Sequence, residues 1–224
     1  MRHASLTIYD DALSAIRQFA AFPAMRPYIG PQYSAAIHKR MLVVGESFYF
    51  PDDSTIHRAP STWYRGSQSI LTDEEIAYIH CRHLVQCDWK SPGHKMYREL
   101  NACLGNIGLP QSDKPISHIC FMNTFCRPAA IPGSSFKHCC CSRDIEEAKD
   151  VLNQVMPVIK PEVVVFASKF SWESVGQFAA PIWPTCKFAF VSHPTDPFHW
   201  NVVSYRHGRT KFMDILRAEF LCAS

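Results

Sequence analysis

The sequence lacks the features that mark several classes of protein. It has no apolar run of membrane-spanning length, and its longest apolar stretches have the length of β-strands. Its N-terminus does not show the basic, apolar and small-residue pattern of a signal peptide. It contains no internal repeat and no low-complexity tract. These absences predict a cytoplasmic globular protein without a membrane partner.

A strong excess of one charge is also missing. The 224 residues include 23 Lys and Arg against 20 Asp and Glu, which gives a net charge of +3. A dedicated nucleic-acid-binding domain is usually more basic, so this charge permits DNA as a partner without arguing for it. An apolar content of 47% with 19% charged residues is ordinary for a globular protein. The length suits one large domain, or a domain with an extension.

The two-residue cysteine spacing of zinc knuckles is absent, although the chain has ten cysteines. Without a signal peptide, we expect free thiols in a reducing compartment. Two groups are candidate metal sites: the consecutive Cys139-Cys140-Cys141, and a helix face carrying His80, His83 and Cys87. Free cysteine usually packs as a small hydrophobe, so packing is the favoured interpretation. We predict no metal and no cofactor.

Apolar runs of strand length alternate with helical patterns. The strands are expected at residues 41–45, 115–122, 162–167 and 186–191. Helices are expected at residues 11–22, 72 to 83 or 87, 94–106, 143–155, 171–178 and 209–221. Thr72 followed by Glu75 is a capping box. This alternation predicts an α/β fold, a three-layer α-β-α sandwich with a central four-stranded parallel sheet. Residues 1–40 are expected to form an N-terminal helical extension packed on a domain of residues 41–224.

Polar residues follow three of the predicted strands. The first strand leads into Gly45-Glu46-Ser47-Phe48-Tyr49, the second into Asn123, and the fourth into Ser192-His193-Pro194-Thr195. Open α/β folds keep their sites just past the carboxyl ends of parallel strands. The aromatic loop at 46–70 is too long to be a simple connection, which favours a functional role. We therefore expect these segments to converge in one site.

In order and spacing, these segments resemble the uracil-DNA glycosylase superfamily. That family has a first loop typified by Gly-Gln-Asp-Pro-Tyr, a base-reading Asn after the second strand, and His-Pro-Ser after the fourth. The corresponding blocks here are Val43 to Tyr49, Phe121-Met122-Asn123, Val164-Val165-Phe166-Ala167-Ser168 and Ser192 to Thr195. The resemblance covers residues 41–222 approximately.

The resemblance implies an enzyme that flips a uracil or another deaminated base out of DNA and hydrolyses its N-glycosidic bond. His193 would stabilise the departing base anion, and Glu46 or Ser47 would act at the sugar. Asn123 would read the base edge. The further substrate-binding residues would be Gly45, Phe48, Tyr49, Ser168, Ser192, Thr195 and Phe198, with Phe198 or Trp200 as an apolar wedge. Arg206, His207, Arg209 and Lys211 would contact phosphates.

The chain departs from the family pattern at the catalytic loop. Ser47 stands where the family usually has a water-activating Asp or Asn, and Glu46 stands where it often has Gln. Glu46 could serve as the carboxylate from one place earlier, and Asp52 and Asp53 are other candidates. Two alternatives follow. One is a non-catalytic member of this fold that binds a nucleotide or nucleic acid. The other is an α/β hydrolase with Ser47 as nucleophile and His193 as base, although the second Gly of a nucleophile elbow is missing.

Overall fold

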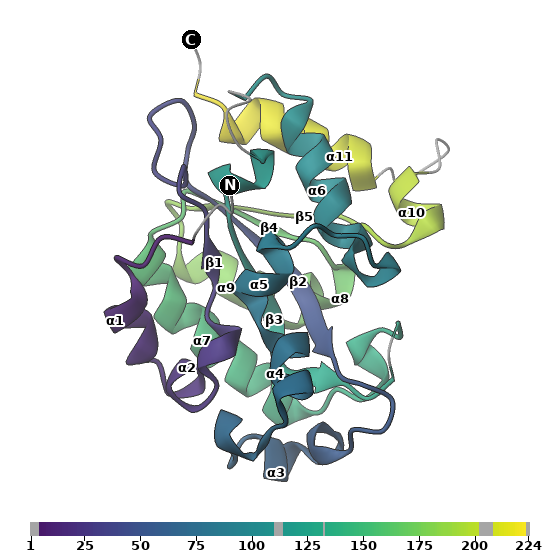
Figure 1. Ribbon diagram of the computed structural model, residues 1–224. Coiled ribbons are helices and arrows are strands. Elements are labelled where there is room, and N and C mark those ends of the chain that lie inside the picture. Colours follow the sequence, from purple (N-terminus) through teal and green to yellow (C-terminus); the bar gives the residue numbers. More distant parts are fainter. Residues whose placement is uncertain (1–4, 110–113, 132, 202–207, 223–224) are drawn as a thin grey trace.

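A five-stranded sheet forms the centre of the computed structural model, which describes residues 5–109, 114–131, 133–201 and 208–222 (Figure 1). The strands are β1 (Tyr28–Ile29), β2 (Met41–Tyr49), β3 (Cys120–Ala129), β4 (Val163–Phe166) and β5 (Lys187–Phe190), in the spatial order β1-β3-β2-β4-β5. Strands β2 to β5 are parallel, whereas β1 is antiparallel to β3. The predicted α/β class is confirmed. The predicted sheet of four parallel strands is incomplete, because β1 makes the sheet mixed.

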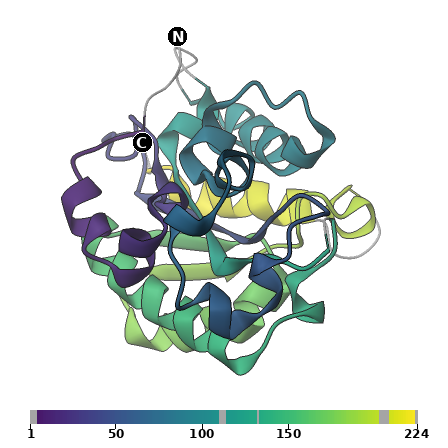
Figure 2. The ribbon, with the colours of Figure 1, turned by 60° about the horizontal axis from the view of Figure 1, so that its bottom comes forward.

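Helices surround this sheet. They are α1 (Asp10–Ser14), α2 (Arg17–Ala21), α3 (Pro60–Trp63), α4 (Asp73–Ile79), α5 (Cys81–Gln86), α6 (Lys95–Gly105), α7 (Ser142–Ile159), α8 (Lys169–Ser171), α9 (Gln177–Ile182), α10 (Pro197–Asn201) and α11 (Gly208–Ile215). Segments of π-helix at Trp172–Gly176 and Leu216–Phe220 extend α8 and α11. In Figure 2 helices α4, α5 and α6 lie on one side of the sheet, and α7 and α9 lie on the other. The sheet therefore forms a middle layer with helices packed on both of its faces.

Two predicted helices are interrupted. The one expected at 72–87 begins as predicted, with the Thr72 and Glu75 capping box, but breaks at His80. His80 has a non-helical ψ of 83°, and its Nδ1 accepts the His83 N–H at 3.2 Å, which starts α5. The one expected at 11–22 breaks at Ile16, whose backbone is extended. Hydrophobic periodicity therefore predicted one continuous helix in each of these two segments, whereas the local backbone conformation breaks each into two.

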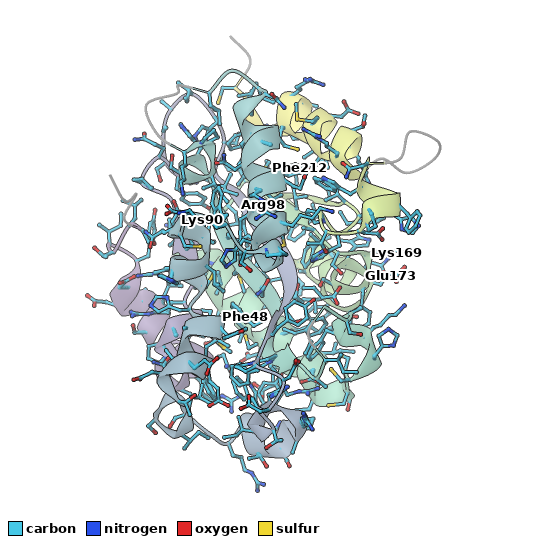
Figure 3. All side chains as sticks on the ribbon, turned by 45° about the vertical axis from the view of Figure 1, so that its right-hand side comes forward. Phe48, Lys90, Arg98, Lys169, Glu173 and Phe212 are labelled. Atoms are coloured by element: carbon cyan, nitrogen blue, oxygen red, sulfur yellow. The ribbon has the colours of Figure 1, made fainter. Side chains whose placement is uncertain are left out.

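Residues 5–40, expected as a helical extension, also supply strand β1 and part of the core. Leu13 and Phe19 are buried, and the Phe22 ring stacks on Trp63 with their centroids 4.4 Å apart. Phe48 and Phe212 lie inside the same core (Figure 3). No helix of the described ranges has both the length and the apolar character to cross a membrane.

The predicted ends of the first two strands are wrong. Strand β2 continues past Gly45 to Tyr49, and β3 continues past Asn123 to Ala129. Gly45 pairs with Asn123 and Ser47 pairs with Phe125, so the polar residues lie within the sheet. Residues 115–118, expected as strand, form a 3₁₀ turn. Inter-strand hydrogen bonds stabilise these polar segments as strand, and that pairing is not visible in a local sequence pattern.

The topology places a crevice between β2 and β4. After β2 the chain crosses to the face covered by α4, α5 and α6, whereas after β4 it enters α8 and α9, on the face of α7. Adjacent parallel strands whose connections leave toward opposite faces form a switch point, which is where open α/β folds bind ligands.

Candidate active site at the carboxyl ends of β2, β4 and β5

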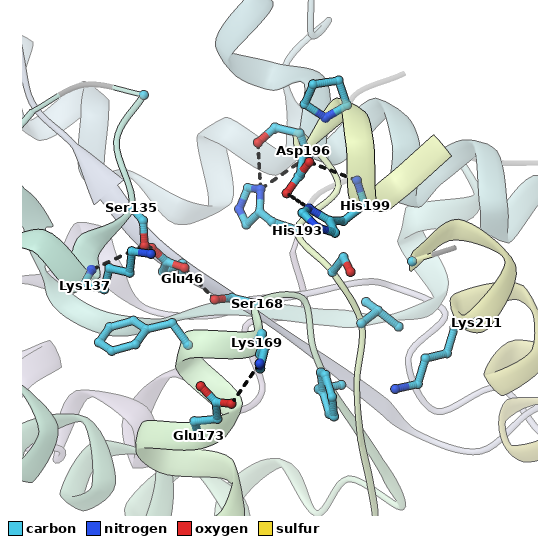
Figure 4. A pocket seen from close by; sticks show the side chains of 18 of the residues that line it. Glu46, Ser135, Lys137, Ser168, Lys169, Glu173, His193, Asp196, His199 and Lys211 are labelled. Atoms are coloured by element: carbon cyan, nitrogen blue, oxygen red, sulfur yellow. Dashed lines mark hydrogen bonds and ion pairs between the residues drawn. The ribbon is translucent and has the colours of Figure 1, made fainter. Parts of the chain in front are cut away.

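A cavity of about 1130 Å³ lies at this switch point (Figure 4). Its wall comes from the end of β2, the turn before α7, the start of α8, the segment after β5, and α11. The titratable side chains on this wall are Glu46, Tyr49, Lys137, Lys169, Glu173, His193, Asp196, His199 and Lys211. Such a hollow with several convergent polar groups is the usual form of a small-molecule site.

Three hydrogen bonds hold the Glu46 carboxylate in the cavity. Its Oε1 accepts hydrogen bonds from the Ser135 hydroxyl at 2.8 Å and the Phe136 backbone N–H at 2.6 Å, and its Oε2 accepts one from Ser168 Oγ at 2.5 Å. No Lys or Arg of the described part of the chain forms an ion pair with it. A carboxylate has about four acceptor sites, so one site on Oε2 remains for a water or a substrate atom.

A buried ion pair anchors the turn that holds Glu46. Arg127 Nη2 and Asp144 Oδ2 are 2.6 Å apart, and both side chains are fully buried. Arg127 also donates to the Cys139 carbonyl at 2.7 Å, and its guanidinium lies 5.0 Å from the Phe136 ring centroid. Tyr64 donates its hydroxyl to Asp144 at 2.8 Å. Burial alone would raise the pKa of Asp144, but these hydrogen bonds and the Arg127 charge hold it below its usual value.

His193 presents a neutral ring to the cavity. Its Nδ1 accepts the Thr195 backbone N–H at 3.3 Å and lies 2.7 Å from Thr195 Oγ1. Because Nδ1 accepts an N–H, the ring proton of the neutral form is on Nε2. Burial lowers the pKa of His193, while the negative charges of Glu46 and Asp196 act in the opposite direction. His193 therefore offers an Nε2–H donor at neutral pH.

The structure brings together six of the residues expected from the sequence. Glu46, Tyr49, Ser168, Ser192, His193 and Thr195 all line the cavity. Ser168, expected as a substrate-binding residue, donates its hydroxyl to Glu46 and accepts the Ser171 N–H at the start of α8. Its hydroxyl is thus a support for the carboxylate.

The other residues expected to act on the base or the sugar do not line the cavity. Gly45, Ser47 and Asn123 sit within paired strands, Phe48 is a core residue, and Phe198 is 74% exposed on α10. A Cβ on Gly45 would lie 2.3 Å from Asn123 Oδ1, so the close neighbour of Gly45 is this amide. Side chains of a strand alternate between its faces, which separates Gly45 and Asn123 from Glu46. Asp52 and Asp53 are outside the cavity wall as well.

Ser135 and the Phe136 N–H were not expected from the sequence. They belong to the turn after β3, and their partner Glu46 is about 90 residues away in sequence. No sequence signal marked them, because the predicted strand ended before Arg127, and the burial of Arg127 within β3 is a feature of the structure. Of the expected phosphate contacts, Lys211 lines the cavity, whereas Arg206 and His207 lie outside the described residues.

Within the described ranges, no group of three or more His, Cys, Asp or Glu side chains is placed to hold a metal ion. The ten cysteines are free thiols. In the consecutive group, Cys141 caps the N-terminus of α7, and burial raises the pKa of Cys140 to about 12. Cys140 therefore has the character of a structural thiol.

No protein-family model matches the chain, and no curated protein matches it either. The function is therefore argued from the cavity itself.

Proposed function

We propose that the protein is a base-excision enzyme of the uracil-DNA glycosylase superfamily, which hydrolyses the N-glycosidic bond of a deaminated base in DNA. The observation that carries the proposal is a fixed carboxylate, Glu46, and a neutral imidazole, His193, on the wall of one cavity. The parallel strands β3-β2-β4-β5, with helices on both faces, support the corresponding three-layer α-β-α fold.

The two groups match the charges that develop as the glycosidic bond breaks. The sugar becomes positive, and the free acceptor site on Glu46 stabilises that charge or orients the attacking water. The departing base becomes negative, and the Nε2–H of His193 donates to its carbonyl oxygen. A neutral donor suits this role because it needs no proton uptake from solvent. The hydrogen bonds on Glu46 hold its carboxylate in place before substrate arrives.

Other cavity residues bind the nucleotide. Tyr49 donates its hydroxyl to the Ser134 carbonyl at 3.3 Å, which leaves its ring to pack against a base. Burial and the Glu46 charge raise the pKa of Tyr49, so its hydroxyl stays protonated. Phe198, exposed on α10 beside the cavity residues Pro197 and His199, is placed to enter the base stack. DNA is the proposed partner.

A glycosylase assay tests this proposal. Labelled oligonucleotides carrying uracil, hypoxanthine or xanthine, single- and double-stranded, are incubated with the protein and then heated in alkali. We expect strand scission. The His193→Ala variant should lose about 10²–10³-fold in rate, as for removal of one donor to a developing anion. Glu46→Gln should lose about 10²–10⁴-fold. His83→Ala is the matched control, because His83 is exposed and does not line the cavity.

The position of Ser47 bears on both alternatives. Its Oγ is buried, and among the described residues it has no hydrogen-bond partner, so His193 does not activate it. This disfavours a Ser-dependent hydrolase. A Ser47 without a partner cannot activate water. The protein is then non-catalytic unless Glu46 takes over the role of the family's usual water-activating Asp or Asn. Absence of scission on every oligonucleotide, from protein that is folded and binds DNA by fluorescence anisotropy, would establish that binding role instead.

A further inference from the structure

The residue expected to read the base lies outside the cavity. Asn123 pairs with Gly45 inside the sheet and does not belong to the cavity wall. In the proposed reaction His193 donates one hydrogen bond to a carbonyl oxygen of the base. That single donor is satisfied by cytosine as well as by uracil, because both bases carry a carbonyl at C2. Selection of a deaminated base therefore needs a second polar group whose direction is fixed.

His199 is a second imidazole on the same wall, and Asp196 fixes its ring proton. His199 Nδ1 lies 2.7 Å from Asp196 Oδ2. Asp196 Oδ1 accepts the backbone N–H groups of Phe198 and His199, each at 3.0 Å. Burial would raise the pKa of Asp196, but its hydrogen bonds to His199 and Phe198 hold it below its usual value. An ionised carboxylate only accepts, so His199 Nδ1 carries a proton and Nε2 of the neutral ring carries a lone pair.

The two imidazoles of this wall therefore have opposite polarity. His193 accepts the Thr195 N–H at Nδ1 and offers an Nε2–H donor, whereas His199 offers an Nε2 acceptor. One turn holds both residues, because the Asp196 N–H donates to the His193 carbonyl at 2.9 Å. In the view of Figure 4, the Asp196 carboxylate lies between the two rings. A hydrogen-bonded turn thus presents one donor and one acceptor to the same cavity.

We propose that His193 and His199 together read the lactam edge of a base, which is a carbonyl oxygen next to a ring N–H. The carbonyl oxygen accepts from His193 Nε2–H, and the ring N–H donates to His199 Nε2. The inference rests on the proposed binding of a flipped base in this cavity, and it names the class of base that the site accepts. Asp196 is the positioning residue, since it sets the tautomer of His199.

Deamination creates the edge that this pair fits. Uracil has an N–H at N3 beside its carbonyl oxygens, and hypoxanthine has an N–H at N1 beside O6. Cytosine has a bare N3 and adenine a bare N1, so the lone pair of that nitrogen would face the lone pair of His199. In adenine the amino group would also face the His193 donor. Guanine and thymine carry a lactam edge too, so the pair selects by hydrogen-bond pattern and not by the size of the base.

The expected selectivity is modest, because the His199 side chain is 62% exposed in the free protein. One neutral hydrogen bond changes an affinity by about 2–10-fold. The same exposure makes His199 replaceable, since its side chain is not part of the core.

Fluorescence anisotropy with single-stranded oligonucleotides tests the proposal. The oligonucleotides differ at one nucleotide, which carries uracil, cytosine, hypoxanthine or adenine. A 2′-fluorine on that nucleotide disfavours positive charge on the sugar, so binding is measured without excision. At about pH 8, above the usual imidazole range, uracil should bind about 2–10-fold more tightly than cytosine. Hypoxanthine should exceed adenine by about as much.

Asp196→Asn is the sharpest variant. The Asn oxygen keeps the cap of α10, and its NH₂ group then takes the place of Oδ2. An N–H that faces His199 Nδ1 moves the ring proton to Nε2, so His199 becomes a donor. We expect the preference for uracil and hypoxanthine to be lost in this variant and in His199→Phe. His83→Phe is the matched control, because His83 is exposed and lies outside the cavity wall. It should keep the preference.

Three results would overturn the proposal. These are no preference in the unsubstituted protein, an unchanged preference in both variants, or equal weakening for all four bases. Release of uracil from unfluorinated oligonucleotides, assayed in parallel, reports on base excision separately. A preference that depends on His199 without base release would leave the reading pair in a binding protein. Base release with a preference that neither variant changes would keep excision and remove the pair.

Discussion

Replacing Asp144 with Ala should be among the most destabilising single changes in this protein. Both Asp144 oxygens are used: Oδ1 accepts from Arg127 Nε and the Tyr64 hydroxyl, each at 2.8 Å. Oδ2 accepts from Arg127 Nη2 at 2.6 Å and from the Cys141 N–H at 2.9 Å. The substitution leaves a guanidinium in the interior without its counter-ion, because the Arg127 side chain is fully buried.

The expected loss follows from that burial. Breaking a buried ion pair from one side costs about 3–5 kcal/mol of unfolding free energy, because the remaining charge is uncompensated. For a domain of this size, each kcal/mol lowers the melting temperature by about 2–4 °C, which gives a decrease of about 6–20 °C. Tyr64→Phe removes one hydrogen bond and should cost only about 1 kcal/mol.

Urea denaturation measures these differences. The double variant Arg127→Met with Asp144→Leu should be less destabilised than Asp144→Ala, because it removes both charges and keeps apolar volume. A double variant that is more stable than the single variant is the result expected for a buried ion pair, and it is not expected for a surface ion pair. A loss below about 1 kcal/mol for Asp144→Ala would refute the reasoning, since surface ion pairs have that value.

Three further predictions concern stability. Gly45→Ala should cost about 1–3 kcal/mol in urea denaturation, because the added Cβ would lie 2.3 Å from Asn123 Oδ1. Thr72→Ala should cost about 1 kcal/mol by the same assay, since it removes the cap that accepts the Glu75 N–H. Burial lowers the pKa of His38. Its contribution to stability is therefore complete above the unfolded pKa and is lost as pH falls through the folded pKa. The urea midpoint should therefore decrease as the pH is lowered from about 7.5 to about 5.

The parts of the fold that local sequence determines were predictable. The Thr72 cap and helix α6 depend on neighbouring residues, and both agree with the expectation. The four apolar runs all became strands. What failed was non-local: β1 has only Tyr28 and Ile29, and it exists because β3 offers hydrogen bonds at the sheet edge. No periodicity in two residues could indicate such a strand.

The site was half predictable for a related reason. Position after an apolar run indicated Glu46 and His193, and both line the cavity, because the carboxyl ends of parallel strands share one edge. It misplaced Ser47 and Asn123, since the strands continue through them and side-chain alternation then sets their faces. The Ser135 turn was missed because its bonds to Glu46 join distant segments. The positions of the strand ends would have been needed to tell which of these residues line the cavity and which lie within the sheet.

The location of Glu46 inside β2, instead of in a loop, has a chemical consequence. Its backbone is fixed in the central strand, and its donors come from the turn before α7 and the start of α8. In the proposed reaction, a carboxylate held in this way needs little reorganisation when charge develops at the sugar. His193 follows the edge strand β5, and its Nδ1 contacts are to Thr195, two residues away. In the proposed base excision, any adjustment to bases of different shape should therefore occur on the His193 side, while the position of the sugar relative to Glu46 stays constant.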